Sequence, residues 1–519
     1  MGTATKILWI DDEIELLKPH ILFLEGKGIE VETVNNGSDA LSILEHLHVD
    51  IIFLDEQMPG LTGLETLAKI KELYPSQLVV MVTKSEEEQI MDEAIGAKIS
   101  DYLIKPVSPN QLFLAIKKHT EKERLIEEKT GIDYQKEFRR IGSQLSSSLS
   151  YKEWENIYKK LVHWNFELSG STDENLKEIL ENQFSDANAL FARYIERNYL
   201  SFLRQKRTDM QFEMSHTVLQ KKLFPLLGQN KVPVFFILID NLRFDQWKIL
   251  QPFLKKSFPK IKEDTYMSIL PSVTQYARNS LFAGLMPLEI KEQYPEYWID
   301  EDIDENKNQY EKELLEQYLS RCGYKTEITY NKVLNQSYGI KIIDYLPKML
   351  RTSLNVIIYN FVDMLSHAST EIELLREMSK NDSAYRSLVV SWFEHSPLYS
   401  LLKRISEEKV KIVLTTDHGS VRVTDPLHVR GDKESSFNLR YKNGSNLDYN
   451  SADVFAVKNP ADAFLPSEGL TSSYIFCRKY DYFVYPNNYA QYVKYYKNTI
   501  QHGGISLEEM VVPIITIES

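Results

Sequence analysis

Five polar residues in the first 110 positions have the types that phosphoryl transfer needs. Each follows a short apolar run, and they are Asp11, Asp12, Asp55, Thr83 and Lys105. Crowded carboxylates repel one another, and a hard divalent cation such as Mg²⁺ offsets that repulsion. Asp55 is then a candidate nucleophile toward a phosphoryl group, while Lys105 and Thr83 can pair with the oxygens of the resulting acyl phosphate.

A second set of chemically competent residues is spread over positions 231–519. Its members follow apolar runs or lie beside glycines, and they are Asp240, Asp363, His367, Asp417, His418 and His502. Carboxylate and imidazole ligands together suit Zn²⁺, with Mn²⁺ as the alternative. If a helix or turn starts near Asp363, the four-residue spacing places His367 on the same side.

The segment LPSVTQYARNSLFAGL at 270–285 supplies a candidate nucleophile for this second set. Pro271 and Ser272 predict a turn into a helix, which puts Thr274 in the first helical turn, where backbone N–H groups and the dipole favour an anion. A bound metal ion lowers the pKa of an alcohol and so activates it. Four residues are candidates for binding the non-bridging phosphate oxygens, although helix surface or packing is the simpler role for each: Arg278, Asn279, Asn241 and Arg243.

The elements that must position the first set form a doubly wound parallel sheet. Runs rich in β-formers alternate with amphipathic stretches long enough for crossover helices, at 6–10, 30–34, 50–54, 78–82 and 101–104. Such a rhythm predicts parallel strands with helices on both faces. Ligands bind these sheets at the carboxyl ends of the strands, and all five polar residues fall at that edge.

The β pattern disappears after about residue 121. Apolar positions from 154 to 162 mark one helical face, and Ser171 with Glu174 predicts a capping box for a further helix. Strand and helix patterns then alternate again, with strands predicted at 234–239, 354–362 and 410–416. The acidic stretch between 289 and 327 is typical of a solvated insertion. We therefore predict an α/β domain at 1–121, a helical bundle linker at 122–230 and a larger α/β domain at 231–519.

Composition narrows the classes of function. The 519 residues carry a formal net charge of −13, and residues 123–230 hold equal numbers of acidic and basic side chains. Because a DNA-reading module needs a basic face, this balance disfavours DNA binding. The longest strongly apolar run, at 232–239, is shorter than the ~20 residues that span a bilayer. With two cysteines and no signal-peptide pattern, we expect a cytoplasmic protein with no membrane insertion.

The first part resembles CheY-like receiver domains of response regulators in WIDDE, FLDEQMPGLTGLE, MVT and DYLIKP, over residues 1–120. The resemblance implies that a sensor histidine kinase phosphorylates Asp55, with Mg²⁺ in the acidic pocket. It also implies that Thr83 and Tyr102 are the switch pair that reports the phosphate to the outer face. Ordinary packing is the alternative role for Tyr102.

The last part resembles the PglZ branch of the alkaline phosphatase superfamily in LIDNLRFD, SILPSVTQYARNSLFAG, NFVDMLSH, TTDHG and HGGISLEEM. The resemblance implies two Zn²⁺ ions roughly 4 Å apart. One would be held by Asp240, Thr274, Asp417 and His418, and the other by Asp363, His367 and His502. Thr274 would form a covalent phospho-intermediate that water then hydrolyses.

The order of the three parts resembles the PorX-type response regulators of type IX secretion. That resemblance implies a PorY-type sensor histidine kinase, homodimer formation on phosphorylation, and a phosphodiesterase acting on nucleotide or oligonucleotide substrates. One alternative is an output domain that binds DNA. Another is a metal-stabilised, non-catalytic domain that docks a sigma factor, although such a scaffold needs no nucleophile at Thr274.

Overall fold

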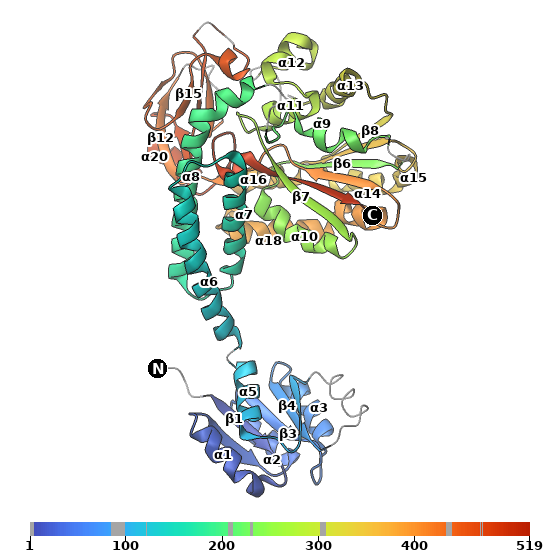
Figure 1. The fold of residues 1–519 in the computed structure, drawn as a ribbon, viewed down its shortest axis with the longest axis vertical. Helices are drawn as coiled ribbons and strands as arrows, with labels where there is room; N and C mark the ends of the chain where they lie inside the picture. The colour runs from blue at the N-terminus through green and yellow to red at the C-terminus, as the bar shows by residue number, and fades with distance from the viewer. Residues whose placement is uncertain are drawn as a thin grey trace. The chain divides into compact units, whose positions relative to one another are not determined.

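The computed structural model describes residues 5–84, 99–120, 122–205, 211–228, 232–300, 308–431, 438–467, 469 and 471–518. The chain divides into two compact units, Met1–Gln135 and Lys136–Ser519 (Figure 1). The predicted boundaries at 121/122 and 230/231 both adjoin positions outside the described residues, so they stay predictions. Among the described residues, no helix combines the length and the apolar character that crossing a bilayer requires.

The first unit contains a five-stranded parallel sheet in the order β2-β1-β3-β4-β5. Its strands are β1 (Lys6–Ile10), β2 (Glu30–Val34), β3 (Ile51–Asp55), β4 (Leu78–Thr83) and β5 (Asp101–Ile104). Successive side chains of a strand point to opposite faces, so Leu8 and Ile10 join one buried core while Ile7 and Trp9 join the other. The predicted doubly wound sheet is confirmed, and β3 and β4 each end one residue later than predicted.

Helices cover both faces of this sheet. The core around Ile7 is covered by α1 (Lys18–Glu25) and α5 (Pro109–Thr120), and the core around Leu8 by α2 (Gly37–Leu44) and α3 (Gly63–Leu73). A short 3-10 turn, η1 (Ile14–Leu17), precedes α1. The crossover predicted after β4 falls on 85–98, which lies outside the described residues.

Three long helices form the predicted helical linker region, which is confirmed. They are α6 (Lys122–Leu145), which crosses from the first unit into the second, α7 (Tyr151–Glu167) and α8 (Glu174–Arg204). Trp154 of α7 packs edge-on against Phe191 of α8, with ring centroids 5.5 Å apart. The predicted capping box at Ser171 is wrong, because Asp173 is the N-cap and its carboxylate accepts from the backbone N–H groups of the first turn.

The second unit is built on a six-stranded mixed sheet in the order β7-β19-β10-β6-β9-β8. Its strands are β6 (Val234–Ile239), β7 (Lys260–Met267), β8 (Ile328–Val333), β9 (Leu354–Tyr359), β10 (Lys411–Thr415) and β19 (Val511–Glu518). The four strands β10, β6, β9 and β8 are mutually parallel, while β19 is antiparallel to both of its neighbours. Strand β9 ends three residues before the predicted end, because α16 (Phe361–Glu371) begins there.

Helices and small sheets surround this mixed sheet (Figure 1). The helices are α9 (Val218–Lys222), α10 (Phe244–Lys255), α11 (Asn279–Ala283), α12 (Pro287–Gln293), α13 (Glu311–Arg321), α14 (Gln336–Asp344), α15 (Leu346–Met349), α17 (Glu373–Met378), α18 (Asp382–His395), α19 (Pro397–Ile405), α20 (Tyr489–Tyr496) and α21 (Leu507–Met510), with short turns η2 (Phe224–Leu226), η3 (Thr274–Arg278), η4 (Pro295–Tyr297) and η5 (Pro460–Ala463). The small sheets contain β11 (Val421–Arg422), β12 (Asp425–Arg430), β13 (Tyr441–Gly444), β14 (Asp448–Tyr449), β15 (Phe455–Val457), β16 (Ser473–Phe476), β17 (Asp481–Val484) and β18 (Ile500–Gln501).

Helix α13 corrects the prediction of a solvated insertion between 289 and 327. Glu311, Leu314 and Leu319 of this helix are buried, so this segment is part of the interior. The acidic positions 301–307 lie outside the described residues.

Candidate functional site

The acidic residues predicted for the first unit lie together at the carboxyl edge of its sheet. One carboxylate oxygen each from Asp11, Asp12 and Asp55 lies within 4.8 Å of the others. Lys105 places its Nζ 2.7 Å from Asp11 Oδ2 and 3.0 Å from Asp55 Oδ1. Asp11 and Asp55 are buried, whereas Asp12 is exposed. This acidic triad fits Mg²⁺, which prefers carboxylate oxygens and keeps several waters.

Burial and pairing act against each other in this pocket. Burial raises the pKa of Asp55 above its usual value, the charge of Asp11 adds to the rise, and the contact with Lys105 opposes it. Burial lowers the pKa of Lys105, but its contacts with Asp11 and Asp55 outweigh this effect and leave the pKa raised. The lysine therefore stays charged at neutral pH and balances carboxylates that would otherwise repel one another.

The two predicted switch residues occupy different surroundings. Thr83 is fully buried at the end of β4, and its carbonyl accepts a 2.7 Å hydrogen bond from the backbone N–H of Lys105. Tyr102 is half-buried on β5 and packs against the core that contains Leu8. Thr83 is thus at the predicted edge, and the switch role of the pair stays a prediction.

In the second unit, the residues that follow β6 and β10 form a buried triad. Asp240, Asp417 and His418 each offer one ligand atom within 4.8 Å of the others. The Nε2 of His418 is 3.8 Å from Asp240 Oδ1 and 3.7 Å from Asp417 Oδ2. Its Nδ1 donates to the carbonyl oxygen of Gly419 at 3.1 Å, which leaves a lone pair on Nε2 facing the carboxylates. The imidazole nitrogen and the carboxylate oxygens that face one another here are atoms that a metal cation can bind.

Burial changes the pKa values of all three residues of this triad. Burial lowers the pKa of His418 to about 4, so the imidazole is neutral at physiological pH. Burial raises the pKa of Asp240 well above its usual value, and the charges of Asp417 and Asp363 add to the rise. Burial also opposes ionisation of Asp417, but Arg278 and His418 outweigh it and lower its pKa.

Thr274 lies beside this triad at the start of the π-helical turn η3. Its Oγ1 is 3.2 Å from His418 Nε2 and 3.5 Å from Asp240 Oδ1. From Thr265 to Pro287 every residue is buried except Thr274, which is half-buried. Thr274 is therefore the one residue of this segment that is not buried.

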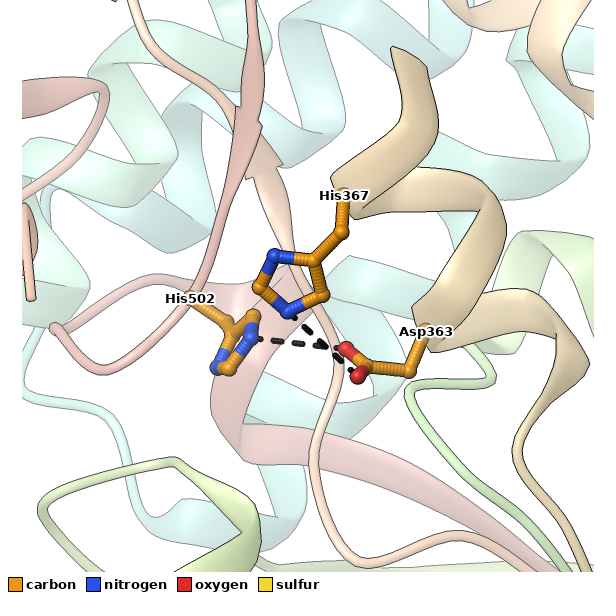
Figure 2. Close-up of side chains that lie close together, drawn as sticks. All are labelled: Asp363, His367 and His502. Carbon is orange, nitrogen blue, oxygen red and sulfur yellow. Dashed lines mark ion pairs between the residues drawn. The ribbon is translucent and has the colours of Figure 1, made fainter. Parts of the chain in front are cut away.

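A second triad adjoins the first. Helix α16 carries Asp363 and His367 one turn apart, and His502 follows β18 (Figure 2). The Nε2 atoms of His367 and His502 are each 3.4 Å from an oxygen of Asp363. The rings of His502 and His418 stack with centroids 4.3 Å apart, which brings the two triads side by side.

The second triad also has the chemistry of a metal site. The Nδ1 of His502 is buried without a hydrogen-bond partner. Burial opposes ionisation of Asp363, but its contacts with His367 and His502 outweigh this and hold its pKa well below the usual value. The same contact raises the pKa of His367. One carboxylate and two imidazoles therefore converge in this triad, which makes it, like the first triad, a possible metal site.

Of the structural roles considered for Arg278, a place on the helix surface is wrong. Its guanidinium is completely buried and forms ion pairs with Asp240, Asp417 and Glu311. The Nε–Asp417 Oδ2 distance is 2.9 Å and the Nη1–Glu311 Oε1 distance is 3.5 Å. Glu311 also contacts Lys332 and the hydroxyl of Tyr330. Arg278 therefore supplies a buried positive charge that balances the carboxylates of the first triad.

The other three candidates for phosphate binding have internal partners. Asn241 donates to Asp363 Oδ1 at 3.2 Å, and its backbone φ of 62° is left-handed, a conformation that asparagine tolerates. Asn279 accepts from the side chain of Asn308, which also donates to the carbonyl of Thr274. Arg243 is buried in ion pairs with Asp245 and Asp382. These contacts make Asn241 and Asn279 supports of the site.

Glycines in the metal-ligand loops permit close backbone approach. A Cβ on Gly419 would lie 2.0 Å from the carbonyl oxygen of Glu508, and one on Gly504 would lie 2.7 Å from that of Cys477. The loop after His502 is held by Glu509, which accepts from the Gly504 backbone N–H at 2.9 Å and pairs with the buried Arg440. Sequence reasoning missed Glu311, Glu509 and Arg440, because no local pattern marks a charged residue whose partner is far along the chain.

Three protein-family models match most of the chain. Residues 7–117 match the response regulator receiver domain, and residues 124–203 match the PorX response regulator linker domain. Residues 218–517 match the BREX system PglZ alkaline phosphatase-like domain. A receiver domain implies a cognate sensor histidine kinase as partner.

Two curated relatives match a stretch of the chain about as long as its receiver domain. AlgB of Pseudomonas putida, an alginate biosynthesis transcriptional regulatory protein, is 37% identical over 120 residues, which are 23% of this chain and 27% of AlgB. The transcriptional regulatory protein ResD of Bacillus subtilis is 31% identical over 113 residues, which are 22% of this chain and 47% of ResD. The chain thus spans less than half the length of these relatives, so their role in transcriptional regulation is not carried over.

Solved structures match the same region. A CheY-like receiver domain from Methanospirillum hungatei is 29% identical, with a TM-score of 0.23, and the match covers 24% of this chain and 98% of that one. A receiver domain from Clostridium thermocellum is 32% identical, with a TM-score of 0.22, over 23% of this chain and 98% of that one. Because the PglZ match covers more than half of the residues and follows a receiver and a PorX linker, the chain belongs to the PglZ alkaline phosphatase-like family and is a PorX-type response regulator.

Proposed function

We propose that the PglZ domain is a zinc-dependent phosphodiesterase with Thr274 as its nucleophile. The observation that carries the proposal is the position of the Thr274 hydroxyl, 3.2 Å from His418 Nε2 in a segment whose other side chains are buried. Asp240, Thr274, Asp417 and His418 would hold one zinc ion, and Asp363, His367 and His502 the other. Bound zinc would lower the pKa of the threonine hydroxyl and screen the charge of the phosphoryl oxygens.

The proposed reaction has two displacement steps. The oxygen of Thr274 attacks the phosphorus of a diester, the bond to the leaving alcohol breaks, and a phosphothreonine ester remains. Water then attacks the same phosphorus, the bond to the threonine oxygen breaks, and the monoester product leaves with the hydroxyl restored. Asn308 and Asn279 support this geometry, because Asn308 donates to the carbonyl of Thr274 at 3.1 Å and to Asn279 Oδ1 at 2.8 Å.

The proposed substrates are linear or cyclic nucleotides and oligonucleotides, and the proposed control is phosphorylation of Asp55 by a PorY-type sensor kinase. Phosphorylation would promote homodimer formation, and the biological output would be regulation of type IX secretion. These finer assignments are supported by the order of receiver, PorX linker and PglZ domain along the chain.

The catalytic proposal is tested with two substitutions at one position. We expect Thr274→Ala to lower hydrolysis of bis(4-nitrophenyl) phosphate by at least about 1,000-fold, because water alone must then attack. Thr274→Ser keeps a hydroxyl and should retain measurable activity. Zinc content measured by mass spectrometry is the control for an intact site. Parental activity in a zinc-loaded Thr274→Ala protein would contradict the nucleophile assignment.

The control by the receiver is tested separately. We expect acetyl phosphate with Mg²⁺ to drive dimer formation in the parent chain, measured by light scattering, and Asp55→Ala to abolish it. The zinc content of Asp55→Ala should equal that of the parent, since the two sites lie in different units. Acetyl-phosphate-dependent dimers in the Asp55→Ala protein would contradict receiver control of assembly.

A further inference from the structure

A cavity of about 280 Å³ opens along α16, the helix that carries two residues of the second triad. It lies where β8 and β9 end, at the same edge of the sheet as Asp240 and Asp417, because these strands run parallel to β6 and β10. Helix α16 forms one wall with Phe361 and Met364, and the same helix carries Asp363 and His367. The cavity, here called the α16 slot, thus shares a helix with the candidate metal ligands.

The slot is lined by aromatic rings. Phe361 and Trp392 stack with centroids 4.5 Å apart and planes 3° apart, and Tyr359 meets Trp392 at 6.4 Å. Met364, half of whose surface is exposed, adds a polarizable thioether that contacts ring edges favourably. Surfaces of this kind suit a flat aromatic ligand, because stacked and edge-on ring contacts are both available to it.

One polar group in the wall of the slot is open to a ligand. His395, an exposed residue of α18 that lines the slot, donates through Nδ1 to the carbonyl of Ser391 and keeps Nε2 free to accept. The slot therefore favours a ring that carries hydrogen-bonding atoms over a purely apolar group.

We propose that the α16 slot binds the nucleobase of a nucleotide whose phosphate lies at the two triads. This inference rests on the proposed phosphodiesterase function and adds a base-binding subsite to it. Every base has a π-face, so stacking here is tolerant of base identity, and purines and pyrimidines both enter. A purely apolar side chain of a partner protein would make no hydrogen bond with Nε2 of His395.

The test compares ligands that differ only by the base. Calorimetric titration of the zinc-loaded full chain with AMP, CMP and ribose 5-phosphate separates base binding from phosphate binding. We expect AMP to bind at least about tenfold more tightly than ribose 5-phosphate (about 1.4 kcal/mol). Phe361→Leu, which removes one stacked ring, and His395→Phe, which removes the hydrogen-bonding ring nitrogens, should each reduce this ratio while the affinity for ribose 5-phosphate is unchanged. Tyr345→Phe, at an exposed tyrosine outside the slot, is the matched control and should not change the ratio.

The outcomes separate this inference from the catalytic proposal. Equal affinities for AMP and ribose 5-phosphate, or a ratio that both slot variants leave intact, would overturn the base subsite even in a chain that hydrolyses bis(4-nitrophenyl) phosphate. A zinc-loaded chain that hydrolyses no diester but selects AMP through Phe361 would support the subsite and refute the catalysis. Either result is read from binding, which does not require turnover.

Discussion

The receiver pocket and the first PglZ triad both gather carboxylates at the carboxyl ends of parallel strands, yet they balance the charge differently. In the receiver, Lys105 contacts Asp11 and Asp55 with a side chain that is 12% exposed, and Asp12 is open to solvent. In the PglZ domain, the side chain of Arg278 has no exposed surface and pairs with Asp240, Asp417 and Glu311.

This difference teaches what each site is built to do. A lysine ammonium on a flexible stem can move from one carboxylate to an arriving phosphoryl oxygen, whereas the planar guanidinium holds a fixed arrangement of partners. The receiver pocket therefore suits transient exchange of Mg²⁺ and phosphate. The PglZ triad suits permanent positioning of the groups around Thr274.

The largest difference between the two pockets is expected when Arg278 or Lys105 is replaced by methionine and the free energy of unfolding is measured. We expect Arg278→Met to lower the free energy of unfolding of the metal-free chain by about 3–5 kcal/mol, because three buried carboxylates lose their partner. Lys105→Met should cost at most about 2 kcal/mol, since the lysine side chain is itself 12% exposed and the pocket opens to solvent at Asp12. Urea unfolding followed by hydrogen exchange of each unit measures both values. Equal losses would refute the distinction between the two pockets.

The second expected difference is in how the stability of the PglZ domain depends on pH. His418 has a pKa lowered from 6.5 to about 4 by burial, so the unfolded chain takes up its proton at a higher pH than the folded chain. The PglZ domain without metal should therefore lose about 3 kcal/mol as the pH falls from 6.5 to 4, and none of this loss above pH 6.5. Stability against pH in EDTA, compared between the parent and His418→Gln, isolates the contribution. Identical pH profiles for the two proteins would contradict the buried neutral histidine.

Glu311→Gln tests how much the ion pair between Glu311 and Arg278 contributes to stability. The amide keeps the shape of the side chain but removes one of three negative charges around Arg278, and we expect a loss of about 1–2 kcal/mol in urea unfolding. Glu316→Gln, at an exposed position of the same helix α13, is the control and should change stability by less than about 0.5 kcal/mol. A larger effect at Glu316 than at Glu311 would contradict the role of the buried pair.

The smallest expected effect is a gain in stability in the receiver, whereas the preceding substitutions are expected to reduce stability. Burial raises the pKa of Asp55, so its charge at neutral pH opposes folding, and Asp55→Asn should stabilise the first unit by on the order of 1 kcal/mol. The pKa of Asp417 is lowered despite burial, so Asp417→Asn should destabilise the second unit. As pH falls through the ordinary carboxyl range, the advantage of Asp55→Asn should shrink. Thermal unfolding at pH 7 and pH 4 checks both signs.

Local patterns in the sequence were sufficient for much of the fold. The five receiver strands match their predicted ranges within one residue, because β-rich runs flanked by turns leave few alternatives. The prediction that Asp363 and His367 share one side was also reachable, since α16 begins at Phe361 and places them one turn apart. Strand β9 was predicted too long, because Phe361 and Val362 continue the apolar pattern after the strand has ended.

Other features depended on partners that are far along the chain. Glu311 follows an acidic stretch and looks solvated in the sequence, but it is buried because Arg278 meets it across 33 residues. Asp173 rather than Ser171 caps α8, a choice between polar residues two positions apart that the capping pattern does not resolve. The aromatic slot between α16 and α18 had no sequence signal, since its rings come from separate elements.

By itself, the sequence determined which residue types could do chemistry and at which strand ends they lie, because periodicity and strand length are local properties. Only the tertiary structure decided that two triads share one site, that His418 stacks on His502, and that a buried arginine balances the first triad. The physical reason is range: hydrophobic patterning acts over one element, whereas charge balance and desolvation depend on every group that folding brings within a few ångströms.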